Sequence, residues 1–158
     1  MDRTEMAGHL IRRLHQQSTQ VFQARTQAAG FDMTSVQFAA LDAIADTPGI
    51  DQAGLAATIG FDRATIGGVI ERLESKGLVE RAVSEMDRRA RRLTLTSTGR
   101  KMLAASRPVV EALQADILGE LSRVERKAFL KLAHKALGLD LRPDSRVAPS
   151  TPRSQGLR

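Results

Sequence analysis

Four arginines lie within five consecutive residues near the middle of the chain, between a turn-like segment and an alternating one. They are Arg88, Arg89, Arg91 and Arg92, in the run D-R-R-A-R-R-L that starts at Asp87. At the tip of a hairpin, these side chains would meet a phosphate backbone or enter the minor groove of DNA, about 6 Å wide, where the negative potential attracts arginine. We expect Asp87 to organise the turn and to pair with a neighbouring arginine. The alternative is a charge run that is simply solvated.

A second group of candidate residues lies on the predicted helix before this hairpin. Its apolar side chains share one face and are Ile66, Val69, Ile70 and Leu73. The opposite surface has small side chains, and Gly67 and Gly68 each cost about 1 kcal/mol relative to alanine inside a helix. Close approach to the major groove would offset that cost and let Arg63, Thr65 and Arg72 reach base edges or phosphates. The alternative is tight packing of the glycines against another helix.

The first predicted helix carries a pair of side chains suited to a carboxylate. His9 and Arg13 are four residues apart, so they project together and would offer a hydrogen bond and a positive charge. Arg12 is the alternative cation, and an ordinary surface pair is the competing interpretation. We expect no metal site, because His9, His15 and His134 lack the spacing that puts two ligands on one helical face.

Composition limits the function classes. The chain has 158 residues, 42% of them hydrophobic, a formal charge of +6 and no cysteine. One domain is expected, with nucleic acid as the first candidate partner and an anionic membrane surface as the second. Disulfides, thiolate zinc sites and thiol redox sensing are excluded. No apolar run reaches the roughly 18 residues of a membrane span and no signal-peptide layout is present, so a cytoplasmic protein is expected.

Enzymatic activity is not expected. The sequence offers no nucleophile with its base, no paired acid and base and no metal cluster. The adjacent glycines lie inside a helix, and no glycine-rich phosphate loop follows a strand. We therefore predict neither catalytic residues nor a cofactor.

Periodicity and capping signals predict a mainly α fold with a small β wing. The capping signals include a box from Thr34 to Gln37, a box from Ser122 to Glu125 and Gly60 as the end of a short helix. The predicted helices cover about 5–30, 34–46, 52–59, 62–76, 98–120 and 122–138, and the strands cover 78–83 and 91–96. Residues 34–96 form a winged helix-turn-helix within one domain at 1–139, and Pro108 is expected to interrupt and kink the long helix. Residues 140–158 are rich in proline and poor in large apolar side chains, which predicts a disordered tail.

The helices outside the winged helix-turn-helix, about 5–30 and 98–138, are predicted to form a homodimer. Their apolar stripes are expected to have no other partner in a chain this short. The side chains on which this prediction rests are Leu103, Val110, Leu113, Ile117, Leu121, Phe129 and Leu132. A twofold dimer would place its recognition helices about one DNA turn apart, ~34 Å, on a near-palindromic site.

Several motifs resemble the MarR family over roughly residues 5–138. The run D-R-R-A-R-R-L matches the D-x-R-x-x-x-L wing signature of that family, and L-T-S-T-G at 95–99 is similar to the start of its long dimerisation helix. T-S-V-Q-F-A-A-L and R-L-E-S-K-G-L-V are similar to the family's second helix and to the end of its recognition helix. The segments G-H-L-I-R-R, G-I-D-Q-A-G-L-A and D-R-A-T-I-G-G-V resemble a subgroup that regulates catabolism of hydroxybenzoate and nicotinate-type acids.

The resemblance implies a homodimeric transcription regulator on pseudo-palindromic double-stranded DNA, usually a repressor released by a small ligand. Similar regulators bind aromatic acids in a cleft between the dimerisation helices and the DNA-binding lobe, which directs attention to His9, Arg12 and Arg13. Many members carry polar or basic residues where this chain has Gly67 and Gly68, so base readout there does not carry over. An architectural protein that coats DNA without reading sequence is the alternative.

Overall fold

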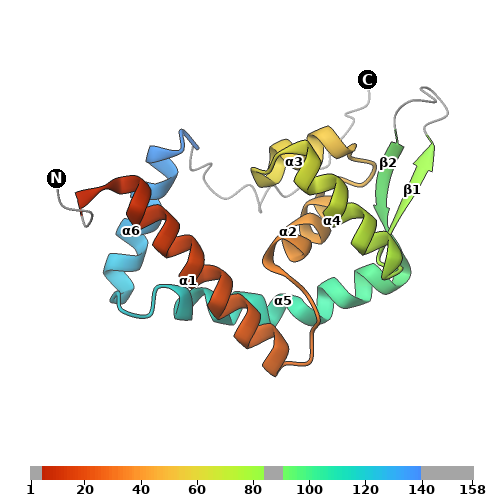
Figure 1. Cartoon of the computed structure of the whole chain (residues 1–158). Helices are drawn as coiled ribbons and strands as arrows, with labels where there is room; N and C mark the ends of the chain where they lie inside the picture. Colours follow the sequence, from red (N-terminus) through yellow and green to blue (C-terminus); the bar gives the residue numbers. More distant parts are fainter. Residues whose placement is uncertain (1–4, 84–90, 140–158) are drawn as a thin grey trace, which may run out of the picture. The chain divides into compact units, whose positions relative to one another are not determined.

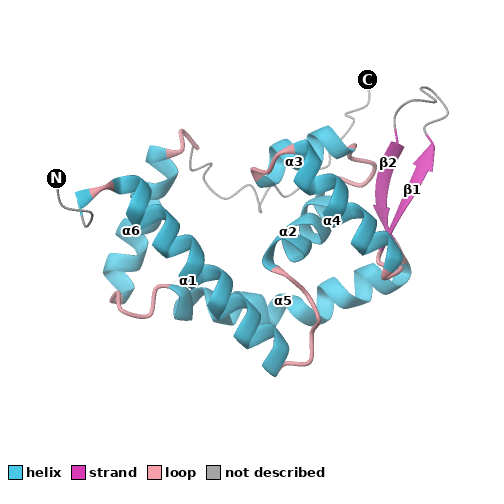
Figure 2. Ribbon diagram, in the orientation of Figure 1, coloured by secondary structure: helices cyan, strands magenta, loops and turns pink. Residues whose placement is uncertain are grey.

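The computed structural model describes residues 5–83 and 91–139, and the chain divides into two compact units, Met1–Ile117 and Leu118–Arg158. The elements of the first unit are α1 (Ala7–Ala28), α2 (Ser35–Asp46), α3 (Gln52–Ile59), α4 (Arg63–Ser75), β1 (Val79–Val83), β2 (Arg91–Leu95) and α5 (Ser97–Ile117) (Figure 1). The second unit contains α6 (Arg123–Ala136). Figure 2 shows that the described chain is mostly helical with one small hairpin, as predicted. The predicted tail, residues 140–158, lies outside the described part.

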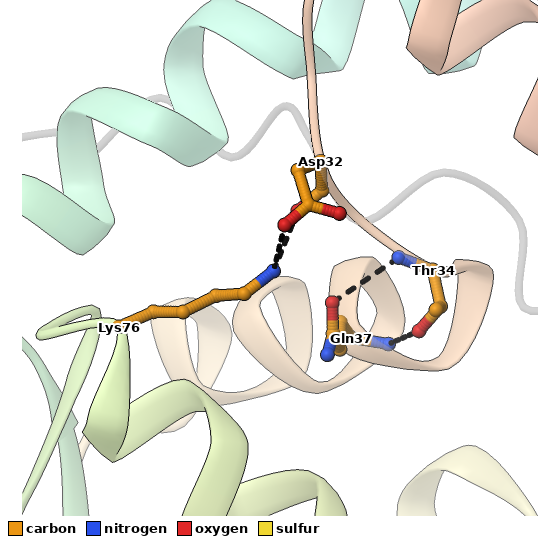
Figure 3. A network of polar contacts seen from close by, with 4 residues as sticks. All are labelled: Asp32, Thr34, Gln37 and Lys76. Atoms are coloured by element: carbon orange, nitrogen blue, oxygen red, sulfur yellow. Dashed lines mark hydrogen bonds and ion pairs between the residues drawn. The ribbon is translucent and has the colours of Figure 1, made fainter.

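Side-chain caps set the starts of the helices around the winged helix-turn-helix. Thr34 and Gln37 form the predicted capping box of α2: the Gln37 amide donates to Thr34 Oγ1 at 3.2 Å, and the Thr34 amide donates to Gln37 Oε1 at 3.2 Å (Figure 3). Beside this box, Lys76 Nζ donates to the backbone carbonyl of Asp32 at 2.7 Å and to its carboxylate at 2.9 Å (Figure 3). The end of α4 is thereby tied to the segment that leads into α2.

The main core joins α2, α3, α4 and the hairpin. Its fully buried large side chains include Leu41, Ile44, Leu55, Ile66, Ile70, Leu73 and Leu93. All four apolar side chains predicted to share one face of α4 are buried. This burial fixes which face of α4 remains available to a partner.

The hairpin pairs β1 and β2 antiparallel, from Val79 opposite Leu95 to Val83 opposite Arg91. Leu93 and Leu95 are buried, whereas Thr94 between them is half-buried and Arg92 before them is exposed, in line with the predicted alternation. A further bridge joins Ile50 to Leu93 on the other side of β2. The sequence predicts only the two strands of the hairpin, because one bridging residue leaves no alternating pattern.

The long helix begins one residue earlier and ends three residues earlier than the predicted range of 98–120. Thr96 caps its start, because Thr96 Oγ1 accepts a hydrogen bond from the Gly99 amide at 2.9 Å and donates to the Gly77 carbonyl at 2.6 Å. Pro108 lies inside the helix without interrupting it, which corrects part of our expectation. Its neighbours on the solvent side, Ala104 and Ala105, are exposed, so water can reach the carbonyl that lacks an amide donor.

Part of the predicted dimer surface is buried within a single chain. Leu103 belongs to the main core, and Val110 and Leu113 pack with Phe22 between α1 and α5. These three side chains therefore have partners within the single chain, which corrects the expectation that only a second copy could cover them. In α6 no residue is buried, and its exposed large apolar side chains include Val124, Leu130 and Leu132. Within residues 5–83 and 91–139, no helix combines the length and the apolar character that a membrane span requires.

Candidate nucleic-acid interface

Asp62 organises the first turn of α4. Its carboxylate accepts hydrogen bonds from the Thr65 amide at 2.9 Å and from the Thr65 hydroxyl at 2.6 Å. The hydroxyl bond first, and the amide bond second, lower the pKa of Asp62 below its usual value. The hydroxyl proton of Thr65 is thus occupied in the free protein, while its oxygen can still accept a hydrogen bond from a base or a water molecule.

Much of the rest of the exposed face of α4 is made of basic and very small side chains, and Glu71 adds one exposed carboxylate. Arg63, Ala64 and Arg72 are exposed. A Cβ atom built at Gly68 would meet no heavy atom within 4 Å, so this part of the helix opens directly to its surroundings. A flat, accessible surface between two arginines is what close approach to a groove requires.

Gly67 has a different neighbour. A Cβ atom at Gly67 would lie 3.1 Å from Gln52 Nε2, and this same amide nitrogen donates to the Arg63 carbonyl at 3.2 Å. The Gln52 side chain therefore braces the start of α3 against α4. Helix packing accounts for Gly67, whereas it gives no reason for Gly68.

The turn between α3 and α4 has a glycine where the chain needs one. Gly60 has a φ of +74°, and the following Phe61 amide donates to the Ala56 carbonyl at 2.9 Å. A left-handed residue at this position ends α3 and lets Asp62 begin α4. Together, α3, this turn and α4 form a helix-turn-helix followed directly by the hairpin.

The hairpin carries the wing arginines in two different settings. Arg91 is exposed at the start of β2. Arg92 is also exposed, but its Nη1 donates to the backbone carbonyl of Gly49 at 3.1 Å. Asp87, Arg88 and Arg89 lie outside the described residues.

The residues predicted to hold a carboxylate lie near the start of α1. His9 is half-buried, and Arg12 and Arg13 are exposed. In Figure 1 this half of α1 extends away from the part of the unit formed by α2, α3 and α4. The described residues contain no group of His, Cys, Asp and Glu side chains that could hold a metal ion.

Two ion pairs that the sequence did not reveal connect α5 to other helices. Arg107 pairs with Asp42 of α2 at 2.5 Å, and Asp116 pairs with Arg25 of α1 at 2.9 Å. The hydrogen bonds that Arg107 donates to the Asp42 carboxylate, followed by the negative charge of that carboxylate, raise the pKa of Arg107 above its usual value. Charged residues separated by 65 and 91 positions leave no local signal in a sequence, so only the fold brings them together.

Comparison with known proteins supports this arrangement. The sequence model of the MarR family matches residues 31–90. The transcriptional regulator HosA of Escherichia coli is 38% identical over 131 residues, which cover 83% of this chain and 94% of HosA.

Two solved structures share both fold and sequence with this chain. BpsR of Bordetella bronchiseptica, whose DNA binding is regulated by 6-hydroxynicotinic acid, superposes with a TM-score of 0.80 and 31% identity over 89% of this chain and 99% of BpsR. The transcriptional repressor CouR, solved bound to a 23-mer DNA duplex, gives a TM-score of 0.76 and 30% identity over 85% of this chain and 94% of CouR. The chain therefore belongs to the MarR family, and it is a DNA-binding transcription regulator with a winged helix-turn-helix, not an enzyme.

Proposed function

We propose that the protein is a homodimeric repressor that binds a pseudo-palindromic operator and leaves it when a small aromatic carboxylate binds. The observation that supports DNA binding is the exposed face of α4. Arg63 in the first turn and Arg72 in the last turn flank a surface on which a Cβ atom built at Gly68 would meet no heavy atom within 4 Å beyond the helix's own backbone. Binding to chromosomal DNA also requires the cytoplasmic location expected from the sequence.

The proposal gives the two DNA-binding elements separate tasks. Arg63, Thr65 and Arg72 of α4 lie in the major groove and select sequence, and Gly68 permits the close approach. Arg91 and the residues of the wing tip, Asp87, Arg88 and Arg89, contribute phosphate or minor-groove contacts. Such contacts raise the affinity for any duplex and make it depend on salt.

The exposed apolar side chains of α1 and α6 support a homodimer. Leu10 and Ile11 of α1 are 46% and 65% exposed, and Leu130 and Leu137 at the other end of the chain are 50% and 72% exposed. Clusters of large exposed side chains of this kind mark association surfaces. In the proposed dimer, a twofold axis relates the two copies of α4 and sets their spacing on the operator.

We place the effector beside His9 and Arg13, with Arg12 as the alternative cation. No side chain between residues 5 and 21 is buried in the single chain, so a closed site for an aromatic ring needs a wall from a second copy. The similarity to BpsR, whose DNA binding is regulated by 6-hydroxynicotinic acid, supports an acid of this type. In the proposed dimer, this wall is apolar surface of α2 and α5 of the second copy.

Release requires that the acid favour a dimer whose recognition helices are wrongly spaced for two successive major grooves. A change from mostly bound to mostly free corresponds to about 100-fold weaker DNA binding. This is about 2.7 kcal/mol of coupling between the two sites, near the upper end of the usual range.

The DNA-binding part is tested by comparing a duplex that the protein selects from a random library with an unselected duplex. Arg63→Ala and Thr65→Ala should reduce the preference for the selected duplex. Arg91→Ala should instead weaken binding to both duplexes equally and lower the salt slope by about one unit. Equal affinity of the unmodified protein for both duplexes would favour the architectural alternative.

A further inference from the structure

Arg92 is the wing arginine whose side chain turns back toward the body of the winged helix. Its Nη1 donates to the Gly49 carbonyl at 3.1 Å, and its Cδ lies 3.7 Å from the position of a Cβ atom built at Gly49. The side chain therefore lies along the bare backbone of that glycine, whose φ is +85°. A side chain at residue 49 would be strained and would crowd the arginine.

The same short segment is joined to β2 by its backbone. The Gly49 amide donates to the Leu93 carbonyl at 2.9 Å, and the Leu93 amide donates to the Ile50 carbonyl at 2.9 Å. The next residue, Asp51, caps α3 through a hydrogen bond from the Gly54 amide at 2.7 Å. Arg92 thus contacts the segment that directly starts the first helix of the helix-turn-helix.

Arg92 lies at the point where the hairpin loses the support of a third strand, so its contact with Gly49 can restrain the direction of the hairpin. The Ile50 bridge ends at Leu93, and from Arg92 toward the tip the described strand residues pair only across the hairpin itself. A two-stranded ribbon without a third strand is free to twist and bend. A side chain that reaches back from this point restrains the direction in which the ribbon leaves the sheet.

Alternation along β2 separates Arg92 from its neighbour Arg91. Arg91 shares a face with Leu93, whereas Arg92 lies on the opposite face with Thr94. Thr94 Oγ1 lies within hydrogen-bonding distance of Glu80 Oε1 of β1, at 3.4 Å. The face that carries Arg92 is therefore occupied by contacts within the protein.

We propose that Arg92 is a positioning residue, which fastens the stem of the wing to the Gly49 carbonyl and so holds the strand that presents Arg91 to the phosphate backbone. This inference rests on the proposed role of the wing in DNA binding. It gives two adjacent arginines different roles: Arg91 binds DNA, and Arg92 holds the hairpin that presents it. A guanidinium suits this role because its several donors keep a fixed geometry on a carbonyl oxygen.

The first measurement is amide hydrogen exchange in the free protein. In Arg92→Ala we expect the amides of Gly49 and Leu93 to exchange about twofold to tenfold faster, which corresponds to the loss of one hydrogen bond. The amide of Ile70 in α4 should be unchanged, and Arg92→Lys should restore much of the protection. Arg91→Ala is the matched control and should leave Gly49 and Leu93 as they are, because a residue that acts only on DNA has no effect in its absence.

The second measurement is a double-mutant cycle on DNA binding. The probe is a fluorescein-labelled duplex of about 30 base pairs, selected by the protein itself and long enough for two half-sites one helical turn apart. Arg91→Ala alone should weaken binding about fivefold, the effect of one phosphate contact at moderate salt. In the Arg92→Ala background the same change should weaken binding less than twofold, because a misdirected wing no longer brings Arg91 to the phosphate.

The outcomes separate this inference from the proposed function. Unchanged exchange at Gly49 and Leu93, or effects of the two substitutions that simply multiply, would overturn the positioning role. A normal affinity of Arg91→Ala would instead contradict the proposed phosphate contact, and the exchange data would still decide whether Arg92 holds the hairpin. Faster exchange together with a non-multiplicative cycle and rescue by lysine supports the positioning role.

Discussion

Gly68 and Gly67 are adjacent on α4, but their surroundings give them different reasons to be glycine. Gly68 faces open space, so Gly68→Ala should raise the free energy of unfolding by about 0.5–1 kcal/mol through its higher helix propensity. The added methyl group would also stand between α4 and the groove, so affinity for the selected duplex should fall. Gly68→Arg should weaken binding further, despite its added positive charge. Urea denaturation and fluorescence anisotropy measure the two quantities.

Gly67→Ala is the matched comparison. Its methyl group would come within 3.1 Å of Gln52 Nε2, and the flexible amide would have to move away from the Arg63 carbonyl. We expect a smaller gain in stability than for Gly68→Ala, or none. If Gly68→Ala or Gly68→Arg bound the selected duplex as tightly as the unmodified protein, close approach would not explain Gly68.

Gly99 is required by the backbone that lies against it. A Cβ atom at this position would be 2.0 Å from the Leu78 carbonyl oxygen, and that backbone is held by the hydrogen bond from the Thr96 amide at 3.1 Å. Gly99→Ala should therefore destabilise the protein by at least about 3 kcal/mol, the upper end of ordinary overpacking. Thermal unfolding measures the loss. Gly8→Ala on α1 is the control and should unfold at or above the original temperature, because the nearest atom there is the end of the Arg12 side chain at 3.9 Å.

At the scale of elements, the N-cap residue of α4 predicts how the free energy of unfolding depends on pH. Hydrogen bonds from Thr65 lower the pKa of Asp62, so the folded state holds the proton less tightly than the unfolded chain does. The stabilisation by this carboxylate is complete above the unfolded pKa, near 3.9, and is lost as the pH falls through the lower folded value. Asp62→Asn keeps one cap acceptor but no charge, so its free energy of unfolding should fall less steeply than that of the unmodified protein between about pH 5 and pH 3.

The check is denaturant unfolding of both proteins over this pH range. A carboxyl resonance followed by NMR should also show Asp62 titrating below pH 3.9 in the folded protein. Parallel stability curves for the two proteins would mean that the hydrogen bonds of Thr65 do not favour the charged carboxylate.

The elements that the sequence predicted well are those with local signals. Examples are the capping boxes at Thr34 and Ser122 and the glycine that follows α3. Each of these signals involves residues only three or four positions apart, so it can be recognised from a short stretch of sequence. Alternation around Leu93 likewise identified the buried face of β2 correctly. The family resemblance added the winged helix-turn-helix and the class of partner.

The features that the sequence missed depend on contacts across the fold. The bridge from Ile50 to Leu93 and the bond from Arg92 to Gly49 each join segments about 43 positions apart. The start of α5 lies one residue earlier than predicted because Thr96, the first threonine of the L-T-S-T-G run, supplies the cap. Leu113 was assigned to a dimer surface because an apolar stripe does not show whether its partner belongs to the same chain.

At the scale of the whole molecule, the exposed side chains of α6 carry the prediction of a dimer. Leu130 of α6 and Leu137, the C-cap residue that follows this helix, are seven positions apart and remain exposed in the single chain. We expect the unmodified protein to be a dimer at micromolar concentration. Leu130→Glu combined with Leu137→Glu should shift sedimentation equilibrium toward the monomer and weaken binding to a duplex with two half-sites.

Lys131→Glu is the control for this pair, because it changes charge without removing apolar surface. It should remain dimeric. A monomer mass for the unmodified protein, or a dimer unaffected by the double substitution, would show that these leucines do not form the interface.

Release by an effector involves the whole molecule, because it couples the proposed acid site on α1 to the proposed DNA-binding surface on α4 and the wing. Hydroxybenzoates and hydroxynicotinates should bind with a dissociation constant below millimolar and should release the protein from its selected duplex. Arg13→Ala should weaken the binding of these acids about tenfold or more, since it removes a charged partner of the carboxylate. It should leave affinity for DNA without the acid nearly unchanged, because Arg13 lies on α1 and not on the proposed DNA-binding elements.

Titration calorimetry with the acids and anisotropy with labelled DNA measure the two sides of this coupling. By linkage, the factor by which an acid weakens DNA binding must equal the factor by which DNA weakens binding of the acid. Arg25→Ala, farther along α1 in the pair with Asp116, is the control for loss of a positive charge from the same helix. If no such acid binds below millimolar concentration, the effector proposal fails. If the acids bind equally to Arg13→Ala and to the unmodified protein, regulation by an acid stands and its site must lie away from Arg13.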